Sequence, residues 1–209
     1  MESKYKTTKR CLLSFLIAVA GLLTACVNTP LPEYYVLTPE RGDVSARLPD
    51  LAVGVGPITI PETVNRQNIV TPQNSNKLNV AEYHRWSEPL RENISRVVIT
   101  NLAERLGVNK LYAYPWLRKQ IDYTTQIDVL QMTGRPGKDV YFQVRWQVLT
   151  GNKPYQLLDT QITEYRMPVA GDGYTSLVAA YSAVIALLSD DIARALRQID
   201  TVQVTASGN

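Results

Sequence analysis

The sequence has few of the residues on which most enzyme and metal sites depend. Its 209 residues include one histidine, two cysteines and two phenylalanines. The histidine, His84, lies between a tyrosine and an arginine in a segment that predicts a strand, a setting typical of a structural histidine. A zinc site needs several ligands together, and no serine lies in a Gly-x-Ser-x-Gly motif. The sequence therefore predicts no catalytic residue, no metal site and no cofactor.

Two glycine-containing segments also lack the features of nucleotide-binding loops. Gly54-Val55-Gly56 follows a predicted strand but has neither the third glycine nor the helix of a dinucleotide-binding loop. Residues 134–138 (GRPGK) have the wrong spacing for a phosphate loop, and Asp139 stands where serine or threonine is required. A hairpin turn accounts for this second segment.

The N-terminal segment, residues 1–25, predicts an export signal. Four basic residues, Lys4, Lys6, Lys9 and Arg10, precede a short uncharged run over 11–23 (CLLSFLIAVAGLL). A basic head, a short apolar run and small residues before a cut are the parts of a secretory signal. A membrane-spanning helix would need about 20 apolar residues, which is more than this run offers. We therefore expect residues 1–25 to be removed on export.

The segment Leu23-Thr24-Ala25-Cys26 resembles the lipobox of bacterial lipoproteins. The alternative is an ordinary signal that contains a cysteine by chance. In lipoproteins the cysteine thiol receives a diacylglyceryl group and the new amine is acylated, for example with palmitate, and two or three chains make membrane attachment stable. An aspartate after the cysteine commonly retains such proteins at the inner membrane, whereas Val27 and Asn28 stand here. The resemblance thus implies a lipid anchor at Cys26 on the periplasmic face of the outer membrane.

Removal of the signal changes both the charge balance and the cysteine content. The signal holds four of the 22 basic residues and one of the 19 acidic ones, so the mature chain, residues 26–209, has equal numbers of each. A neutral chain lacks the basic footprint of a nucleic-acid-binding protein. Cys11 leaves with the signal and Cys26 is acylated, so no disulfide and no thiol nucleophile is expected.

The patterns along the mature chain predict one α+β domain. We expect a tether over 26–33, the domain over 34–199 and a polar, frayed tail over 200–209. One helix is predicted up to Leu106, with Ser87 as its cap and Gly107 as its end, and a second over 174–199 with a kink at residues 189–191. Strands are expected at 34–38, 51–60, 69–70, 77–86, 121–129, 140–148 and 157–167, and a short strand or loop is expected at 108–117. The predicted fold is an α/β sandwich in which a mixed, mostly antiparallel sheet of about six or seven strands is packed by two long helices.

Aromatic residues with polar tips are the most suggestive candidates for contacts. The chain has 12 tyrosines and three tryptophans, and such residues are enriched at protein interfaces. Tyr112, Tyr114 and Trp116 gather in one short segment, and Trp86 lies at a strand-to-helix corner. We predict these four as contacts with a partner or ligand. The alternative is that the tyrosines line the edge of the core and that Trp86 packs under the helix.

Several motifs in order resemble one family of lipoproteins. They are Tyr34-Tyr35-x-Leu37, Val53-x-Val55, Ile58-x-Ile60-Pro61, Asn65-Arg66-x-x-Ile69-Val70 and Trp86-x-Glu88-Pro89-Leu90. Together they resemble the PqiC family of ABC-type transport auxiliary lipoproteins over most of residues 34–197. Family members more often have Tyr-Leu-Asp-Arg where this chain has residues 63–66 (TVNR), so the role of the loop at Asn65 and Arg66 stays open.

The resemblance implies a function in transport between membranes. PqiC-like proteins accompany periplasmic MCE-domain proteins and an inner-membrane permease, which together move lipids between the inner and outer membranes. The chain would dock the MCE component from the outer membrane, and a homo-oligomeric ring would suit that role. The alternative is a periplasmic assembly or stabilising lipoprotein, such as a wall-enzyme activator or a pilotin. A hydrolase is disfavoured because no nucleophile and base can be paired.

Overall fold

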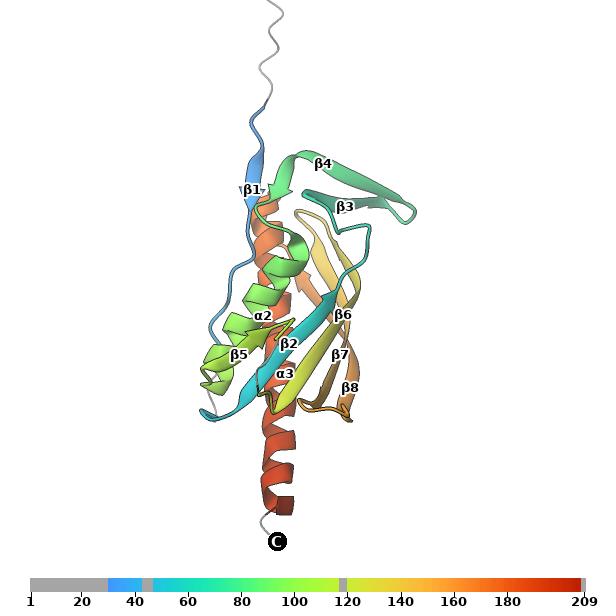
Figure 1. Cartoon of the computed structure of the whole chain (residues 1–209). Helices are drawn as coiled ribbons and strands as arrows, with labels where there is room; N and C mark the ends of the chain where they lie inside the picture. The colour runs from blue at the N-terminus through green and yellow to red at the C-terminus, as the bar shows by residue number, and fades with distance from the viewer. Residues whose placement is uncertain (1–29, 43–46, 117–119, 208–209) are drawn as a thin grey trace, which may run out of the picture. The chain divides into compact units, whose positions relative to one another are not determined.

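Figure 1 shows the computed structural model of the chain, which describes residues 30–42, 47–116 and 120–207. Residues from Pro32 onward form one compact unit. The predicted signal and Cys26 lie outside the described residues, and both stay predictions. The elements are β1 (Glu33–Tyr35), β2 (Ala52–Thr59), β3 (Asn68–Asn74), β4 (Lys77–Trp86), α2 (Leu90–Leu106), β5 (Lys110–Ala113), β6 (Tyr123–Gly134), β7 (Asp139–Thr150), β8 (Leu157–Pro168) and α3 (Tyr174–Ser207).

The described strands form two sheets, whereas the sequence predicts one. The smaller sheet has the order β1-β4-β3 and the larger has the order β5-β2-β6-β7-β8. Strand β1 pairs with β4 in parallel, β2 pairs in parallel with both β5 and β6, and the antiparallel ladders hold most of the paired residues. The predicted α+β class with two long helices packed on mixed sheets is confirmed. Parallel pairs join segments far apart in the chain, so alternation within one segment does not reveal them.

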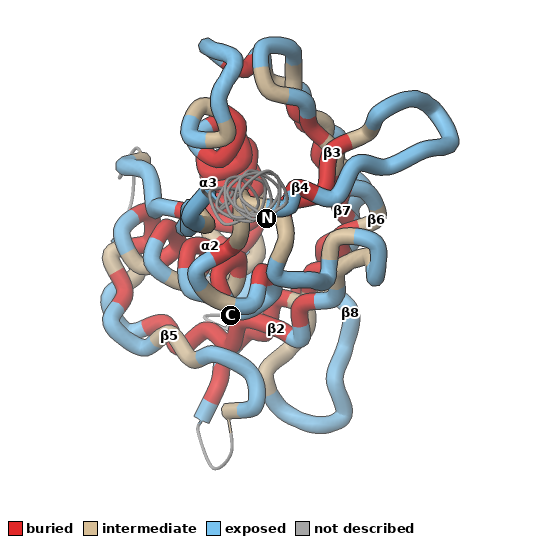
Figure 2. The backbone as a smooth tube through the Cα atoms, turned by 90° about the horizontal axis from the view of Figure 1, so that it is seen from above, coloured by how far each residue is buried: buried red, intermediate tan, exposed pale blue. Residues whose placement is uncertain are grey.

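The antiparallel meander β6-β7-β8 provides the sheet side of the core, and α3 provides the largest share of the helix side. The sequence predicts this hairpin and the third strand, and the structure confirms both. Alternate residues of β7 are buried and face α3, and Figure 2 shows that much of α3 is buried as well. The buried residues of β7 are Val140, Phe142, Val144, Trp146 and Val148. Period-two burial on one face is what a sheet with one covered side requires.

Helix α2 ends as predicted but begins differently. Gly107 adopts the left-handed conformation (φ 62°), and its N–H bonds backbone carbonyls of the last turn. At the other end Pro89 is the N-cap and no side chain caps the helix, so the prediction that Ser87 caps it is wrong. The backbone N–H of Ser87 instead donates to the carbonyl of Tyr35 (2.8 Å), which ties this corner to β1.

Helix α3 is longer and more regular than the sequence predicts. It runs without interruption through residues 189–191 and continues to Ser207, so the predicted kink and the frayed start of the tail are wrong. The hydroxyl of Ser189 donates to the carbonyl of Ile185 (2.8 Å) and is satisfied within the helix. Residues 174–203 are long and apolar enough to cross a membrane, but 67% of the most apolar window is buried against the rest of the domain. The helix therefore packs as a core helix in this structure.

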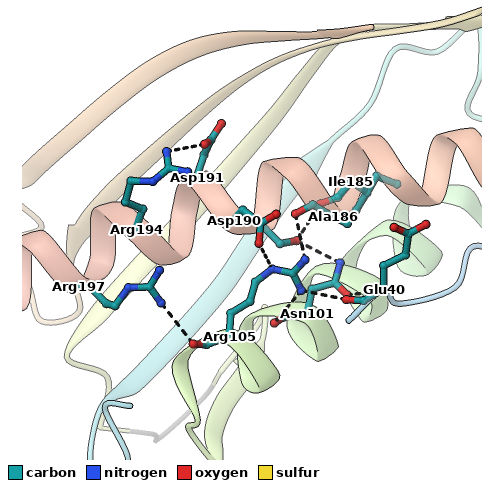
Figure 3. Close-up of polar contacts among 10 residues, drawn as sticks. Glu40, Asn101, Arg105, Ile185, Ala186, Asp190, Asp191, Arg194 and Arg197 are labelled. Atoms are coloured by element: carbon teal, nitrogen blue, oxygen red, sulfur yellow. Dashed lines mark hydrogen bonds and ion pairs between the residues drawn. The ribbon is translucent and has the colours of Figure 1, made fainter. Parts of the chain in front are cut away.

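A buried arginine joins the two helices to the segment that follows β1 (Figure 3). The guanidinium of Arg105 on α2 pairs with Asp190 on α3 and donates to the backbone carbonyls of Glu40 (3.1 Å), Asn101 (3.3 Å) and Ala186 (3.4 Å). The amide oxygen of Asn101 in turn accepts the backbone N–H of Glu40 (3.0 Å). Side chains of α2 and α3 thus fix the backbone of the chain that comes from β1.

Candidate partner-contact surface

The structure places one of the four predicted aromatic contacts in the core. Trp86 is only 3% exposed and packs against Tyr181 of α3, with ring centroids 6.4 Å apart. Its backbone N–H donates to the carbonyl of Gln67 (2.7 Å). A ring that is buried in this way is not available to a partner. The prediction of Trp86 as a contact residue is therefore wrong, and the alternative, that it packs in the core, is correct.

Tyr114 and Trp116 lie together at the end of the larger sheet. They follow β5, the outermost strand of that sheet, and their rings meet edge to face with centroids 5.3 Å apart at 81°. Tyr114 is 58% exposed, whereas Trp116 is half-buried. The pair combines a fixed geometry with an accessible aromatic surface, which is the character of residues that dominate protein interfaces.

Two glycines of β2 make room for these rings. A Cβ atom on Gly54 would come within 3.0 Å of the indole of Trp116, and one on Gly56 would come within 2.8 Å of the Cβ of Tyr114. Gly56 also has a φ of 118°, which other residues rarely adopt. The backbone N–H of Tyr114 donates to the carbonyl of Val55 (3.0 Å) and fixes the segment after β5 on β2. The sequence alone does not reveal this role of Gly54 and Gly56, because the rings that they accommodate lie about 60 residues further along the chain.

A groove of about 340 Å³ runs from Tyr114 to the first turns of α2. Its lining is apolar on the β2 side and polar on the α2 side: Val55, Gly56, Pro57, Ile58, Arg91, Glu92, Ser95 and Tyr114. Arg91 and Glu92 form an ion pair (2.9 Å), and this hydrogen bond holds the pKa of Glu92 below its ordinary value. The groove thus offers aromatic, aliphatic and charged groups within one surface. Arg91 and Glu92 carry no sequence motif that marks them in advance.

Tyr112 belongs to the same edge but is less accessible. It lies within β5 opposite Gly54 of β2 and is half-buried. The structure therefore brings Tyr112, Tyr114 and Trp116 to one edge of the larger sheet and separates Trp86 from them. We define the contact surface as Tyr112, Tyr114, Trp116 and the groove beside them.

The single histidine makes structural contacts. His84 stacks on Tyr174 of α3 with ring centroids 3.9 Å apart, and its Nδ1 lies 2.8 Å from the hydroxyl of Tyr35 on β1. Burial and the neighbouring Glu33 raise the pKa of Tyr35, so that its phenol stays protonated. Across residues 30–42, 47–116 and 120–207, no group of three or more histidine, cysteine or carboxylate side chains is arranged to hold a metal ion.

Comparison with known proteins identifies the family and the fold. The family model for the ABC-type transport auxiliary lipoprotein component matches residues 35–193. Protein XCC0632 from Xanthomonas campestris is 11% identical and superimposes with a TM-score of 0.66 over 81% of this chain and 99% of its own. An uncharacterized protein of known crystal structure is 18% identical, also with a TM-score of 0.66, over 80% of this chain and 99% of its own. A search of curated proteins gave no match.

The two solved structures share the fold at identities too low to indicate more. The family match covers most of the domain and includes every described element from β2 to β8 and the first part of α3. It agrees with the lipoprotein resemblance of the N-terminal segment, and it accounts for membrane attachment through lipid and for association with an ABC-type transport system. The chain belongs to the family of ABC-type transport auxiliary lipoprotein components.

Proposed function

We propose that this chain is the outer-membrane, PqiC-like member of an intermembrane lipid-transport system, and that it docks the periplasmic MCE-domain component. Cys26 is its anchor, and the residues after Cys26 are those of a lipoprotein released to the outer membrane. The docked component connects to an inner-membrane permease. The work of the chain is binding and not catalysis: the sequence has a single histidine, which makes structural contacts, and no Gly-x-Ser-x-Gly motif.

The observation that carries this proposal is the Tyr114–Trp116 pair beside the groove. Tyr114 is exposed, Trp116 is half-buried beside it, and two glycines of β2 make room for both rings. A contact site that is already formed in this way binds a partner at a lower entropic cost. An aromatic anchor at the centre of an interface is commonly worth about 2 kcal/mol or more of binding free energy. The edge position on β5 leaves the site open to a large partner.

Photo-crosslinking from the contact surface tests the proposal. A photoreactive amino acid replaces Tyr114 in the full-length lipoprotein, and cells are irradiated before the envelope proteins are identified by mass spectrometry. The matched control carries the same amino acid at Tyr155, an exposed tyrosine between β7 and β8. We expect an MCE-domain protein to be captured from position 114 and not from position 155.

Two further measurements separate the parts of the proposal. Tyr114→Ala and Trp116→Ala, combined in one variant, should weaken co-purification of the MCE protein by more than tenfold, whereas Tyr155→Ala should leave it unchanged. Phospholipids should accumulate unevenly between the two membranes when the contact is lost. Capture of wall enzymes or a secretin alone would contradict the proposal and favour an assembly or stabilising role.

A further inference from the structure

The hairpin formed by β3 and β4 reaches out sideways from the end of the domain where β1 begins (Figure 1). Near its tip Leu78 and Val80 of β4 are each 44% exposed. They lie two residues apart, so they share one face of the strand. Leu78 pairs with Pro72 of β3, which is half-buried, and Val80 pairs with Val70, which is buried, so the apolar face is exposed toward the tip and covered nearer its base. A projecting apolar face of this kind indicates contact with something outside the domain.

Further exposed apolar residues lie beside β1 of the same small sheet. Tyr34 and Val36 are two residues apart on the opposite face from buried Leu37, and they line a groove with Val178 and Ala179 of α3. Tyrosine beside aliphatic residues is the composition found at membrane–water interfaces. The small sheet thus carries four exposed apolar or aromatic side chains at or beside its strands: Tyr34, Val36, Leu78 and Val80.

Chain length places the hairpin within reach of the anchored membrane. Strand β1 runs parallel to β4, with Glu33 opposite His84. Glu33 lies seven positions after Cys26, and His84 lies seven positions after Lys77 at the hairpin tip. Either stretch spans at most about 25 Å when extended. A tether of this length allows the acyl chains to reach as far from Glu33 as the hairpin tip lies from His84.

The chemistry of the hairpin favours a lipid surface over a protein strand. Strand β3 is the open edge of the small sheet, and Pro72 within it has no N–H to offer to an added strand. Lys77 follows the turn and places a positive charge at the tip, next to Leu78. An apolar face beside a basic residue matches the boundary between acyl chains and phosphate headgroups.

We propose that the β3–β4 hairpin rests on the bilayer that holds the lipid anchor, with Leu78 and Val80 at the boundary between headgroups and acyl chains. The contact orients the domain on the membrane and leaves the contact surface at β5 free for a partner. This inference rests on lipid anchoring of the chain and not on the identity of the transported molecule or of the docked protein.

The cysteine content of the chain allows a direct test. The mature chain has no cysteine besides Cys26, whose thiol is acylated in a lipoprotein, so Leu78→Cys introduces a single reactive thiol. An environment-sensitive fluorophore is attached to this thiol in the full-length lipoprotein, reconstituted in vesicles of phosphatidylethanolamine and phosphatidylglycerol. Ile162→Cys on β8 is the matched control, because Ile162 is 57% exposed on the other sheet. The unsubstituted protein should take up no label.

The fluorophore at position 78 should shift its emission to the blue, and lipids with a nitroxide near the headgroup should quench it severalfold more than they quench the label at position 162. Leu78→Glu combined with Val80→Glu should increase protease access to the hairpin in vesicles while the circular dichroism spectrum stays unchanged. Equal quenching at both positions would overturn the proposal. A response at position 78 that appears only when a protein partner is added would also overturn it.

Discussion

Arg105 of α2 and Asp190 of α3 form an ion pair with unequal burial. The arginine side chain is 2% exposed and the aspartate side chain 38% exposed. The aspartate can therefore be solvated without its partner, whereas the guanidinium depends on Asp190 and on three backbone carbonyls. The cost of breaking the pair should depend on which residue is removed, because an uncompensated buried charge is the expensive outcome.

We predict that Asp190→Ala lowers the free energy of unfolding by about 3 kcal/mol, since it leaves the charge of Arg105 buried. The double variant Arg105→Met with Asp190→Ala should recover part of that loss, because no buried charge remains. Denaturant titrations of the parent protein, Asp190→Ala, Arg105→Met and the double variant measure the coupling. Arg194→Ala is the control: its ion pair with Asp191 is exposed on the arginine side and should contribute less than about 1 kcal/mol. Equal losses for the single and double variants would contradict the assignment.

The raised pKa of Tyr165 predicts that the protein loses stability at alkaline pH. Its hydroxyl donates to the carboxylate of Asp191 (2.6 Å), and burial, followed by this hydrogen bond and the charge of Asp191, raises its pKa far above the ordinary value of 10. In the unfolded chain the phenol releases its proton near pH 10, while the folded protein keeps it. Its contribution is therefore complete below about pH 10 and is lost as the pH rises toward the folded pKa.

Tyr165→Phe should lower the free energy of unfolding by about 1 kcal/mol at neutral pH through loss of the hydrogen bond. Above about pH 10 the difference between the two proteins should shrink, because the variant has no phenol to hold protonated. Urea titrations at several pH values check this, and they must compare differences because burial also raises the pKa of Tyr181. A difference that stays constant with pH would contradict the role of Tyr165.

Local patterns in the sequence predict where most of the elements lie but not how distant segments meet. Alternation predicted β6 and β7, and apolar spacing with Gly107 predicted the end of α2, because each depends on neighbours in the chain. The split into two sheets depends on β1 reaching β4, and the place of Trp86 depends on Tyr181 of α3, which is far away in the sequence. Likewise the need for a glycine at position 54 is visible only once the structure places the ring of Trp116 against it.

Gly54→Ala tests whether the position of the Trp116 ring matters for partner binding. The new methyl would lie 3.0 to 3.1 Å from three carbon atoms of the Trp116 indole, so the ring must move by a few tenths of an ångström. We expect the protein to stay folded, the emission of Trp116 to change and crosslinking from position 114 to decrease. Gly173→Ala is the control, because no atom lies within 4 Å of the added methyl. Unchanged crosslinking in the Gly54 variant would show that the ring position does not matter for binding.

Truncation of Trp86 should destabilise the fold much more than truncation of Tyr114. Trp86→Ala removes a buried ring and should lower the free energy of unfolding by about 3 to 5 kcal/mol. Tyr114→Ala removes an exposed ring and should change it by less than about 1 kcal/mol. Thermal unfolding with both variants in parallel checks the contrast. A stable Trp86 variant that loses only partner binding would restore the interpretation of Trp86 as a contact residue.

The two cysteines allow a matched test of the anchor. Cys26→Ser removes the thiol that receives the diacylglyceryl group, so we expect an unacylated chain that keeps residues 1–25. Cys11→Ser changes the same atom within the apolar run of the predicted signal and should leave acylation and cleavage intact. The mass of the intact protein distinguishes the two outcomes, since correct processing removes everything before Cys26 and adds the acyl groups. If Cys26→Ser yielded a protein of unchanged mass and membrane affinity, the anchor would lie elsewhere, and the tether length that brings the β3–β4 hairpin to the membrane would have to be counted from another residue.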